Sequence, residues 1–348
     1  MLADRLDYVV GVDPHRDAHA LAIVDVRTGG VVFEASVSAS SAGYARALEL
    51  ARAQALGRRA FAIEGTGSFG AGLTRFLNAN GERVLEVGRL RRERRSGGKS
   101  DALDAIRAAR SVLAQSPRPA EPRSGGEREA LRALMAAREG AVTARRAGLC
   151  QLRALLITTP EPLRGELRSL TRARLLRRLA AVRPDRRRDG ELRGTLRALR
   201  SVARRVQRLT EEERELAAEI EALVRTLAPR LLDEPGVGPL AAAQLLISWS
   251  HSGRIRNEAA FARFAGCAPI PASSGQTIRY RLDRGGDRRL NRALHMIIVT
   301  RRRAHAPTTA YIARRIRDGK SPREATRCLK RYLARSLYRL LESTPMPA

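Results

Sequence analysis

Short runs of alternating apolar and polar residues fill the first third of the chain and predict strands and helices of a mixed α/β domain. Thr28-Gly29-Gly30 predicts a turn, so the first three strands are expected to form an antiparallel meander. Ser100 is a candidate cap for the last helix of this part. The expected strands cover 8–13, 18–26, 31–37, 59–64 and 83–87, and the expected helices cover 42–56, 68–80 and 101–115.

Two long helical patterns occupy the middle of the chain. Residues 116–126 are rich in Pro, Gly and Ser and predict a linker, which is followed by helices over 127–156 and 191–227. The second helix carries apolar residues in steps of three and four, which is typical of a coiled-coil seam. Either self-association of the chain or packing of the two helices within one chain would explain this seam. It consists of Leu196, Leu199, Val202, Val206, Leu209, Leu216, Ile220, Leu223 and Leu227.

The last part of the chain reads as a mainly helical domain, with a loop or hairpin over 267–286. The three parts predict an N-terminal α/β domain over 1–115, a linker and coiled-coil helices over 116–230, and a C-terminal domain over 231–348. The expected fold class is therefore α/β plus α. The expected C-terminal helices cover 240–249, 256–266, 288–303 and 322–341.

A formal net charge of +30, from 66 Lys and Arg against 36 Asp and Glu, points to an anionic partner. Nucleic acid is the partner that such a surplus fits, because cations spread along the chain can neutralise phosphates. Nearly all the cations are arginine, with lysine at 99, 320 and 330. We interpret the preference for arginine as a compositional bias, as in a GC-rich host, and the net charge as functional. Aromatic residues make up 4%, so base stacking is not expected to dominate binding.

The remaining composition predicts a reduced, cytoplasmic protein that does not enter a membrane. Cys150, Cys267 and Cys328 lie far apart and form no CxxC pair. The first residues contain acids and no long apolar stretch, unlike a signal peptide. No segment approaches the roughly 20 apolar residues of a membrane span.

Four acidic residues form the strongest candidate for chemistry. Asp13 and Glu64 each end a predicted strand, and Asp101 and Asp104 share one face of a predicted helix. The order of three antiparallel strands followed by alternating helix and strand resembles a ribonuclease-H-like domain, in which the two strand ends are adjacent. Four converging carboxylates need cations to ionise together, and oxygen ligands suit Mg²⁺ or Mn²⁺. Two such ions could hold a scissile phosphate.

Actin-like sugar kinases are a competing fold, because Gly11-Val12-Asp13 followed by a hairpin also begins those proteins. They need a second acidic, glycine-rich phosphate hairpin, which residues 65–98 do not offer. The remainder is also too basic and too helical for that class.

Two segments of the C-terminal part are candidate nucleic-acid contacts. Gly236 and Gly238 precede a helix as in a helix-hairpin-helix element, where backbone N–H groups can approach a phosphate. An ordinary turn before a helix explains the same glycines. A basic run broken by Gly285-Gly286 is expected to bind phosphates. It consists of Arg279, Arg281, Arg284, Arg288, Arg289 and Arg292.

Ser273-Ser274-Gly275 lies in a predicted loop just before this basic run. A serine needs a base or a metal to become a nucleophile, and no histidine lies beside it in sequence. By spacing alone Ser274 is interpreted as a loop residue.

These motifs together resemble the insertion-sequence recombinases that include the Piv DNA invertase, many of which are guided by a bridge RNA. Their N-terminal DEDD domain is similar to the RuvC nuclease and is matched by Gly11-Val12-Asp13, Ile63-Glu64-Gly65 and the segment from Lys99 to Ala105. Their C-terminal transposase domain is matched by Pro235-Gly236-Val237-Gly238, Ala268-Pro269 with Ser273-Ser274-Gly275, and Gly285 to Asn291. The likeness covers most of the chain and is weakest over 157–190.

The resemblance implies roles for these residues. Asp13, Glu64, Asp101 and Asp104 would hold Mg²⁺ (or Mn²⁺), and Ser274 would attack DNA and form a covalent phosphoserine. Ser273 is the adjacent alternative. The partners implied are double-stranded DNA, a noncoding guide RNA and further copies of the chain in a dimer or tetramer.

Two other functions stay open. A RuvC-like structure-specific endonuclease would use the four acids and water without the serine. A non-catalytic nucleic-acid-binding protein would need only the basic surface.

Overall fold

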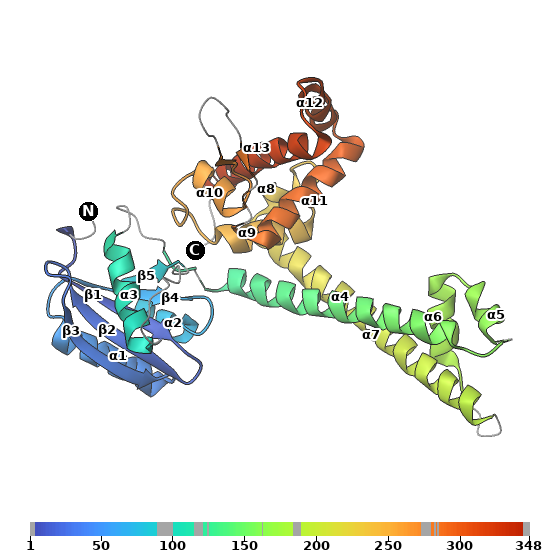
Figure 1. The fold of residues 1–348 in the computed structure, drawn as a ribbon, viewed down its shortest axis with the longest axis horizontal. Coiled ribbons are helices and arrows are strands. Elements are labelled where there is room, and N and C mark those ends of the chain that lie inside the picture. The colour runs from blue at the N-terminus through green and yellow to red at the C-terminus, as the bar shows by residue number, and fades with distance from the viewer. Residues whose placement is uncertain are drawn as a thin grey trace. The chain divides into compact units, whose positions relative to one another are not determined.

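The computed structural model describes residues 4–88, 100–114, 121–123, 125–161, 163–183, 189–272, 280–281, 283 and 285–343 (Figure 1). The chain forms two compact units. The sheet unit comprises Met1–Gly125 and Trp249–Phe261, and the helical unit comprises Gly126–Ser248 and Ala262–Ala348. The division into domains over 1–115, 116–230 and 231–348 stays a prediction.

A five-stranded sheet with strand order β3-β2-β1-β4-β5 forms the centre of the sheet unit. The first three strands are an antiparallel meander, whereas β4 and β5 extend the sheet in parallel from β1. This arrangement confirms the predicted mixed α/β domain and is compatible with the ribonuclease-H-like class. The strands are β1 (Tyr8–Pro14), β2 (Ala18–Asp25), β3 (Val31–Ser38), β4 (Arg59–Glu64) and β5 (Val84–Val87).

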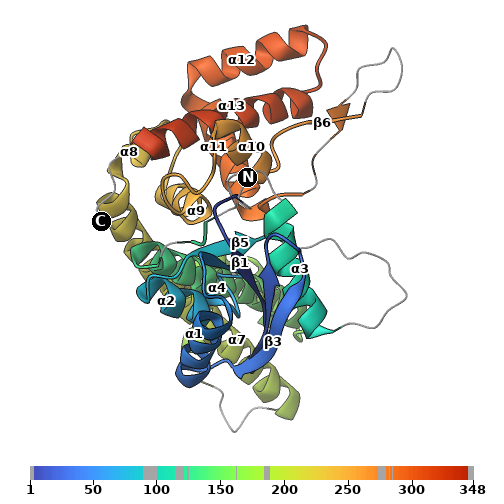
Figure 2. The same cartoon turned by 90° about the vertical axis from the view of Figure 1, so that its left-hand side faces the viewer.

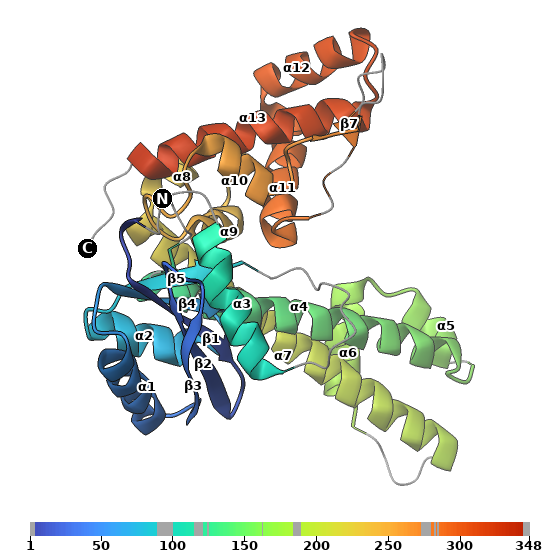
Figure 3. The ribbon, with the colours of Figure 1, turned by 60° about the vertical axis from the view of Figure 1, so that its left-hand side comes forward.

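Helices cover both faces of this sheet (Figure 3). The helices α1 (Ser41–Gln54) and α2 (Ala71–Ala79) pack on one face, where they bury Val10 and Ile63. The helix α3 (Asp101–Ala114) packs on the other face, where it buries residues such as Val9 and Ala62. Side chains alternate between the faces along each strand, so every second residue of β1 and β4 faces α3.

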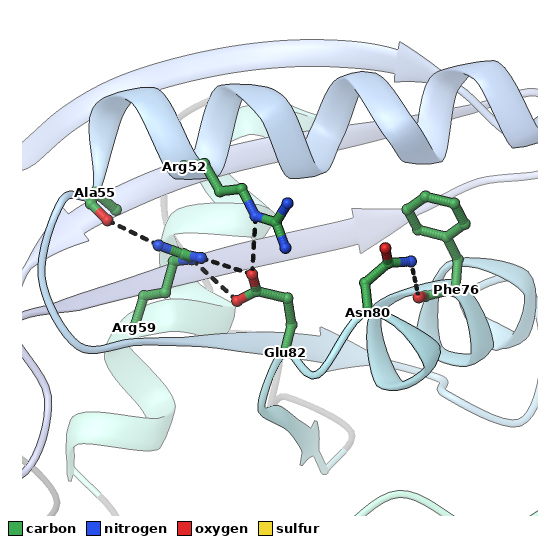
Figure 4. A network of polar contacts seen from close by, with 6 residues as sticks. All are labelled: Arg52, Ala55, Arg59, Phe76, Asn80 and Glu82. Carbon is green, nitrogen blue, oxygen red and sulfur yellow. Dashed lines mark hydrogen bonds and ion pairs between the residues drawn. The ribbon is translucent and has the colours of Figure 1, made fainter.

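A polar network joins α1 and the turn before β5 to the start of β4 (Figure 4). Arg59, at the start of β4, holds the Glu82 carboxylate with two donors at 2.6 and 3.0 Å. Arg52 of α1 donates to the same carboxylate at 3.4 Å, and Arg59 also donates to the Ala55 carbonyl. The Glu82 side chain is 8% exposed, so water screens these contacts less than at the surface. The network thus fixes the end of α1 beside β4.

Contacts of Arg254 and His251 help to join residues Trp249–Phe261 to the sheet unit. Arg254 pairs with Glu86 of β5 at 3.0 Å, with only 8% of the arginine side chain exposed. His251 contacts the Pro122 carbonyl through Nε2 at 3.1 Å. These bonds explain why a distant part of the chain packs with the sheet.

Two long helices, α4 (Glu127–Ile157) and α7 (Gly190–Leu227), pack antiparallel in the helical unit (Figure 1). Glu213 of α7 pairs with Arg138 and Arg145 of α4 at 2.7 and 2.9 Å. The apolar seam of α7 therefore packs within the chain along α4, and Val206 lies directly over Gly148. A coiled coil between copies stays a prediction. Two short helices, α5 (Leu163–Arg168) and α6 (Arg172–Ala181), close an apolar cluster around Leu152 and Leu199.

The rest of the helical unit consists of short and medium helices and one small β pair, seen from the side in Figure 2. The two strands of this pair are antiparallel and lie within the segment 267–286, for which a loop or hairpin was predicted, and α12 packs against both α11 and α13. None of the helices in the described ranges combines the length and apolar character needed to cross a bilayer. The elements are α8 (Pro229–Leu232), α9 (Pro239–Trp249), α10 (Glu258–Phe264), β6 (Ile270–Pro271), β7 (Tyr280–Arg281), α11 (Arg288–Ala304), α12 (Ala306–Arg317) and α13 (Pro322–Ser343).

Several elements differ from the sequence-based expectation. The second helix begins at Ala71 rather than 68, because Gly65 adopts a φ of 69° and starts a turn that accepts from the N–H and hydroxyl of Ser68. The helices α5, α6, α8 and α12 were not expected. Each of them has twelve residues or fewer and buries only one or two residues, so little in the sequence marks it as a separate helix.

Candidate metal centre and nucleic-acid contacts

The ends of β1 and β4 direct two acids to the face of the sheet that α3 covers. Val12 is paired with Ile63 in the parallel register, and Asp13 and Glu64 follow directly. Since partners in a parallel pair point to the same face, both carboxylates lie on the face opposite Val12 and Ile63. That face packs against α3, which begins with Asp101.

Gly11 allows α3 to approach β1 closely. A Cβ atom at this position would lie 1.9 Å from the Ala105 carbonyl oxygen and 2.8 Å from the Ala109 nitrogen. Only a residue without a side chain fits this contact. Asp101 lies one helical turn before Ala105, and Asp13 lies two residues after Gly11, so the close approach brings both acids to the same place.

A histidine joins these two acids. Nε2 of His15 lies 3.1 Å from Oδ2 of Asp13 and 3.2 Å from Oδ1 of Asp101. The Asp13 side chain is 17% exposed, and His15 and Asp101 are more open. The imidazole nitrogen therefore lies between two carboxylates, where a cation would relieve their repulsion.

The electrostatics of Asp13 fit a cation site. Burial raises the pKa of the Asp13 carboxyl above its ordinary value, and repulsion from Asp104 and Asp101 adds to this rise. His15 acts in the opposite direction and lowers the pKa of Asp13, but burial and repulsion outweigh it. Ionisation of Asp13 is thus less favourable than that of an exposed aspartate, and a bound cation would offset this cost.

The donor set also fits a divalent cation in size and chemistry. One ligand atom each from Asp13, His15 and Asp101 lies within 4.8 Å of the others. Ligand atoms this close together could be shared by one divalent cation. Mn²⁺ accepts a nitrogen ligand more readily than Mg²⁺ does. A set of two carboxylates and one imidazole therefore suits Mn²⁺ better than Mg²⁺. The identity of the ion stays a prediction.

The other two predicted acids lie near this group without belonging to it. Asp104 pairs with Arg107 at 2.8 Å, yet its charge still acts on Asp13. Glu64 ends the neighbouring strand, half-buried, on the same face as Asp13. The structure therefore brings Asp13 and Asp101 together directly, with Asp104 and Glu64 around them. Asp13, Glu64, Asp101 and Asp104 remain proposed site residues.

We expect Mg²⁺ to raise the unfolding temperature by a few degrees at about pH 7.5 and by less at about pH 4.5. The raised pKa of Asp13 means that its ionisation costs folding stability. This cost is absent below the ordinary aspartate pKa and sets in as the pH rises through the higher folded-state pKa. A bound cation offsets the cost only where Asp13 is ionised. Thermal melts with and without Mg²⁺ measure the effect, and an equal Mg²⁺ shift in Asp13→Asn would refute it.

Several residues predicted for the C-terminal site lie outside the described residues. They are Ser273, Ser274, Arg279 and Arg284, together with Gly275, and the same is true of Lys99 in the N-terminal part. Arg281 is described and exposed at the end of β7. The serine nucleophile thus stays a prediction.

The two glycines before α9 differ in their surroundings. Gly236 has a φ of 75°, and a Cβ there would lie 2.9 Å from Cγ of Arg301 and 3.0 Å from the Ile297 carbonyl oxygen. Arg301 also donates to the Pro235 carbonyl, so this turn packs on α11. A Cβ at Gly238 would meet no atom within 4 Å. Gly236 therefore has a packing role, and its proposed phosphate contact stays untested.

Arginines at the start of α11 are paired within the helical unit. Arg289 and Arg292 both pair with Glu139 of α4, at 2.8 and 2.9 Å, and the Arg292 hydrogen bond holds the pKa of Glu139 below its usual range. Arg288 is exposed. Asp287 caps α11 by accepting from two backbone N–H groups, and it accepts from the Ser248 hydroxyl at 2.7 Å. The motif from Gly285 to Asn291 thus has a clear local structure.

His15 is the residue of the candidate metal centre that the sequence-based prediction missed. The sequence pattern that could have identified it is its spacing from Asp13. Side chains two positions apart in an extended segment point to the same side.

Comparisons with known proteins agree with the two groups of motifs. A family model of the DEDD type named for IS110, described as "Transposase", matches residues 10–160. A second, described as "Transposase IS116/IS110/IS902 family", matches residues 228–313. The chain is also similar to a protein of Streptomyces coelicolor named "Insertion element IS110 uncharacterized 43.6 kDa protein", with 33% identity over 144 residues. This match covers 40% of the present chain and 36% of that protein, so the chain spans about a third of its curated relative.

Proposed function

The chain belongs to the IS116/IS110/IS902 family of transposases, and from this premise we propose that it is a metal-dependent DNA recombinase of an insertion sequence. The observation that carries the proposal is the convergence of Asp13, His15 and Asp101 under the start of α3. A half-buried acid with a raised pKa beside two further acids is the arrangement expected of a site for phosphoryl transfer.

The residues of the sheet unit would hold and orient the cation. Asp13 and Asp101 supply oxygen ligands, and His15 either adds a nitrogen ligand or holds the two carboxylates in place by hydrogen bonds. Asp104 adds negative charge that acts on Asp13 and favours cation binding, and Glu64 lies on the same face of the sheet. When bound, a divalent cation would polarise the scissile phosphate and stabilise charge on its oxygens.

Ser274 is the proposed nucleophile, with Ser273 as the alternative. Its Oγ would lose a proton and form a bond to phosphorus, while the bond from phosphorus to one sugar oxygen breaks and that oxygen takes up a proton. The product is a phosphoserine ester that keeps the energy of the DNA linkage for rejoining. Exposed arginines such as Arg281 and Arg288 would bind the neighbouring phosphates.

A trapped protein–DNA adduct tests this proposal. The full chain, expressed with its native flanking DNA and supplied with Mg²⁺, is denatured, and covalent DNA is detected by a gel shift. We expect an adduct in the wild-type protein and in Ser273→Ala, and at least a hundredfold less in Ser274→Ala, because an alanine offers no oxygen to attack.

The other outcomes separate the alternatives. Loss in Ser273→Ala alone moves the nucleophile by one residue. Cleaved ends without an adduct identify a nuclease that uses water. DNA binding without cleavage or adduct, even when copurifying RNA is retained, identifies a non-catalytic binding protein.

We also propose a noncoding guide RNA and an assembly of two or four copies as partners. The net charge of +30 supports a nucleic-acid partner but does not distinguish RNA from DNA. Sequencing of RNA that copurifies with the protein tests the guide, and an absence of enriched flanking transcripts would argue against it.

A further inference from the structure

A cavity of about 380 Å³ lies within the helical unit, between the segment around Cys267 and the helices α12 and α13. Its size falls in the range of roughly 300–1,000 Å³ that small-ligand sites have. No part of the candidate metal centre lines it. The cavity is therefore a separate feature that the metal chemistry leaves without a role.

The lining of this cavity is strongly basic. Two acids, Asp283 and Glu324, oppose six cations, and both acids already accept hydrogen bonds from nearby turns. Such an excess in a concave site focuses a positive potential and attracts an anion. The cations are Arg281, Arg315, Lys320, Arg327, Lys330 and Arg331.

Two of these cations have buried or half-buried donor groups that an anionic ligand could stabilise. Nε of Arg315 is buried and has no hydrogen-bond partner among the described residues, while the guanidinium also pairs with Asp318. Lys330 is half-buried and donates to Oδ1 of Asn291 at 2.7 Å, and burial lowers the pKa of its ammonium. An anion in the cavity would offset the cost of burying these donors.

Aromatic rings line the same cavity. Tyr311 and Tyr332 pack edge to face with ring centroids 6.0 Å apart, and Tyr280 of β7 lines the same cavity. Tyr332 is 56% exposed and Tyr280 is 65% exposed, although both are large rings in a chain with only 4% aromatic residues. Exposed rings beside cations are the combination that binds unpaired bases by stacking and their phosphates by charge.

The thiol that lines the cavity does not weaken this potential. Burial raises the pKa of the Cys267 thiol to about 11, so the group is neutral at physiological pH. The positive charge of the site is thus retained.

The position of the cavity favours a nucleotide of DNA, rather than a free nucleotide, as its ligand. The segment that carries Ser273 and Ser274 lies outside the described residues, but Pro269 before it and Tyr280 after it both line the cavity. We infer that this cavity binds one unpaired nucleotide of the DNA strand on which the serine acts, with the base against Tyr332 and the phosphate against Arg331 and Arg315. The inference rests on the proposed function for the identity of the strand.

Binding of oligodeoxynucleotides by the full chain in EDTA tests the inference without any cleavage chemistry. Fluorescence anisotropy is measured with a single strand, with the same strand annealed to its complement, and with the single-stranded RNA of the same sequence. We expect Tyr332→Ala and Arg331→Gln each to weaken binding of the single strand about tenfold and to change duplex binding less than twofold. Tyr332→Phe keeps the ring and is expected to bind like the wild type.

A strand of abasic sugar phosphates separates stacking from charge. Tyr332→Ala should not change binding of this strand, because it offers no base, whereas Arg331→Gln should still weaken it. Arg317→Gln and Met296→Ala are matched controls, since both residues are exposed in the helical unit and neither lines the cavity. Circular dichroism melts of each variant exclude a folding defect.

Unchanged single-strand binding in Tyr332→Ala, an equal loss in the controls, or an equal loss on duplex would overturn the inference. A loss confined to RNA would overturn the assignment to DNA. If the cavity variants behave as expected while the wild type forms no serine adduct, the nucleotide site stands and the proposed recombinase chemistry fails.

Discussion

Replacing Gly11 with alanine is expected to reduce metal-dependent DNA processing at least a hundredfold. The new methyl group would lie 1.9 Å from the Ala105 carbonyl oxygen, a backbone atom that no side-chain rotation can move. The helix α3 must shift away from β1, and Asp101 and Asp104 shift with it. Misplacement of catalytic groups by about 1 Å costs about a hundredfold in rate.

Gly67→Ala is the control for this prediction, because a Cβ at Gly67 would meet no atom within 4 Å. The overpacked Gly11→Ala variant should also lose about 1–3 kcal/mol of folding stability, whereas Gly67→Ala should not. Rates of DNA processing, Mg²⁺-induced shifts in unfolding temperature and binding of duplex DNA are compared. Normal activity and a normal Mg²⁺ shift in Gly11→Ala would show that the close approach of α3 to β1 does not set the site.

Asp13→Asn is expected to reduce strand cleavage and joining by about a thousandfold or more, since loss of a metal ligand removes several kcal/mol of transition-state stabilisation. The amide has the same size but no charge. Because the pKa of Asp13 is raised in the folded protein, its ionisation costs stability, and the variant should melt at the same or a higher temperature without Mg²⁺. DNA binding should be retained.

Asp17→Asn is the matched control, four residues along the chain, where the carboxylate is 77% exposed and pairs with Arg16. Its cleavage rate should equal that of the wild type. Wild-type rates in Asp13→Asn at saturating Mg²⁺ would contradict the metal centre, and a fall in duplex binding would show that Asp13 acts in DNA contact instead.

Much of the sheet unit could be predicted from the sequence because its signals are local. The continuous apolar runs within 8–13 and 59–64 follow from strands that are buried on both faces, with α1 and α2 on one side and α3 on the other. The helical unit was harder to predict. The helix α12 has Pro307 in its first turn, buries Thr308 and Ile312, and begins only two residues after α11 ends, so the sequence gives little sign of a separate helix.

The residues of the candidate sites also differ in whether the sequence predicted them. Asp13, Glu64 and Asp101 end or begin regular elements, and the order of those elements suggested that they converge. His15 follows β1 in an irregular segment and was missed. The cavity could not be predicted, because Tyr280, Arg315 and Tyr332 come from three separate elements that only tertiary packing brings together.

The antiparallel pair of α4 and α7 sets a length scale for the helical unit. With 38 residues, α7 is about 57 Å long, which corresponds to about 17 base pairs of straight B-form DNA. Its first residues lie with α6 and its last with α8. If groups at both ends of this helix contacted one straight duplex, the contacted places would be more than one helical repeat apart. Places closer together on the duplex could be contacted only if the nucleic acid bends.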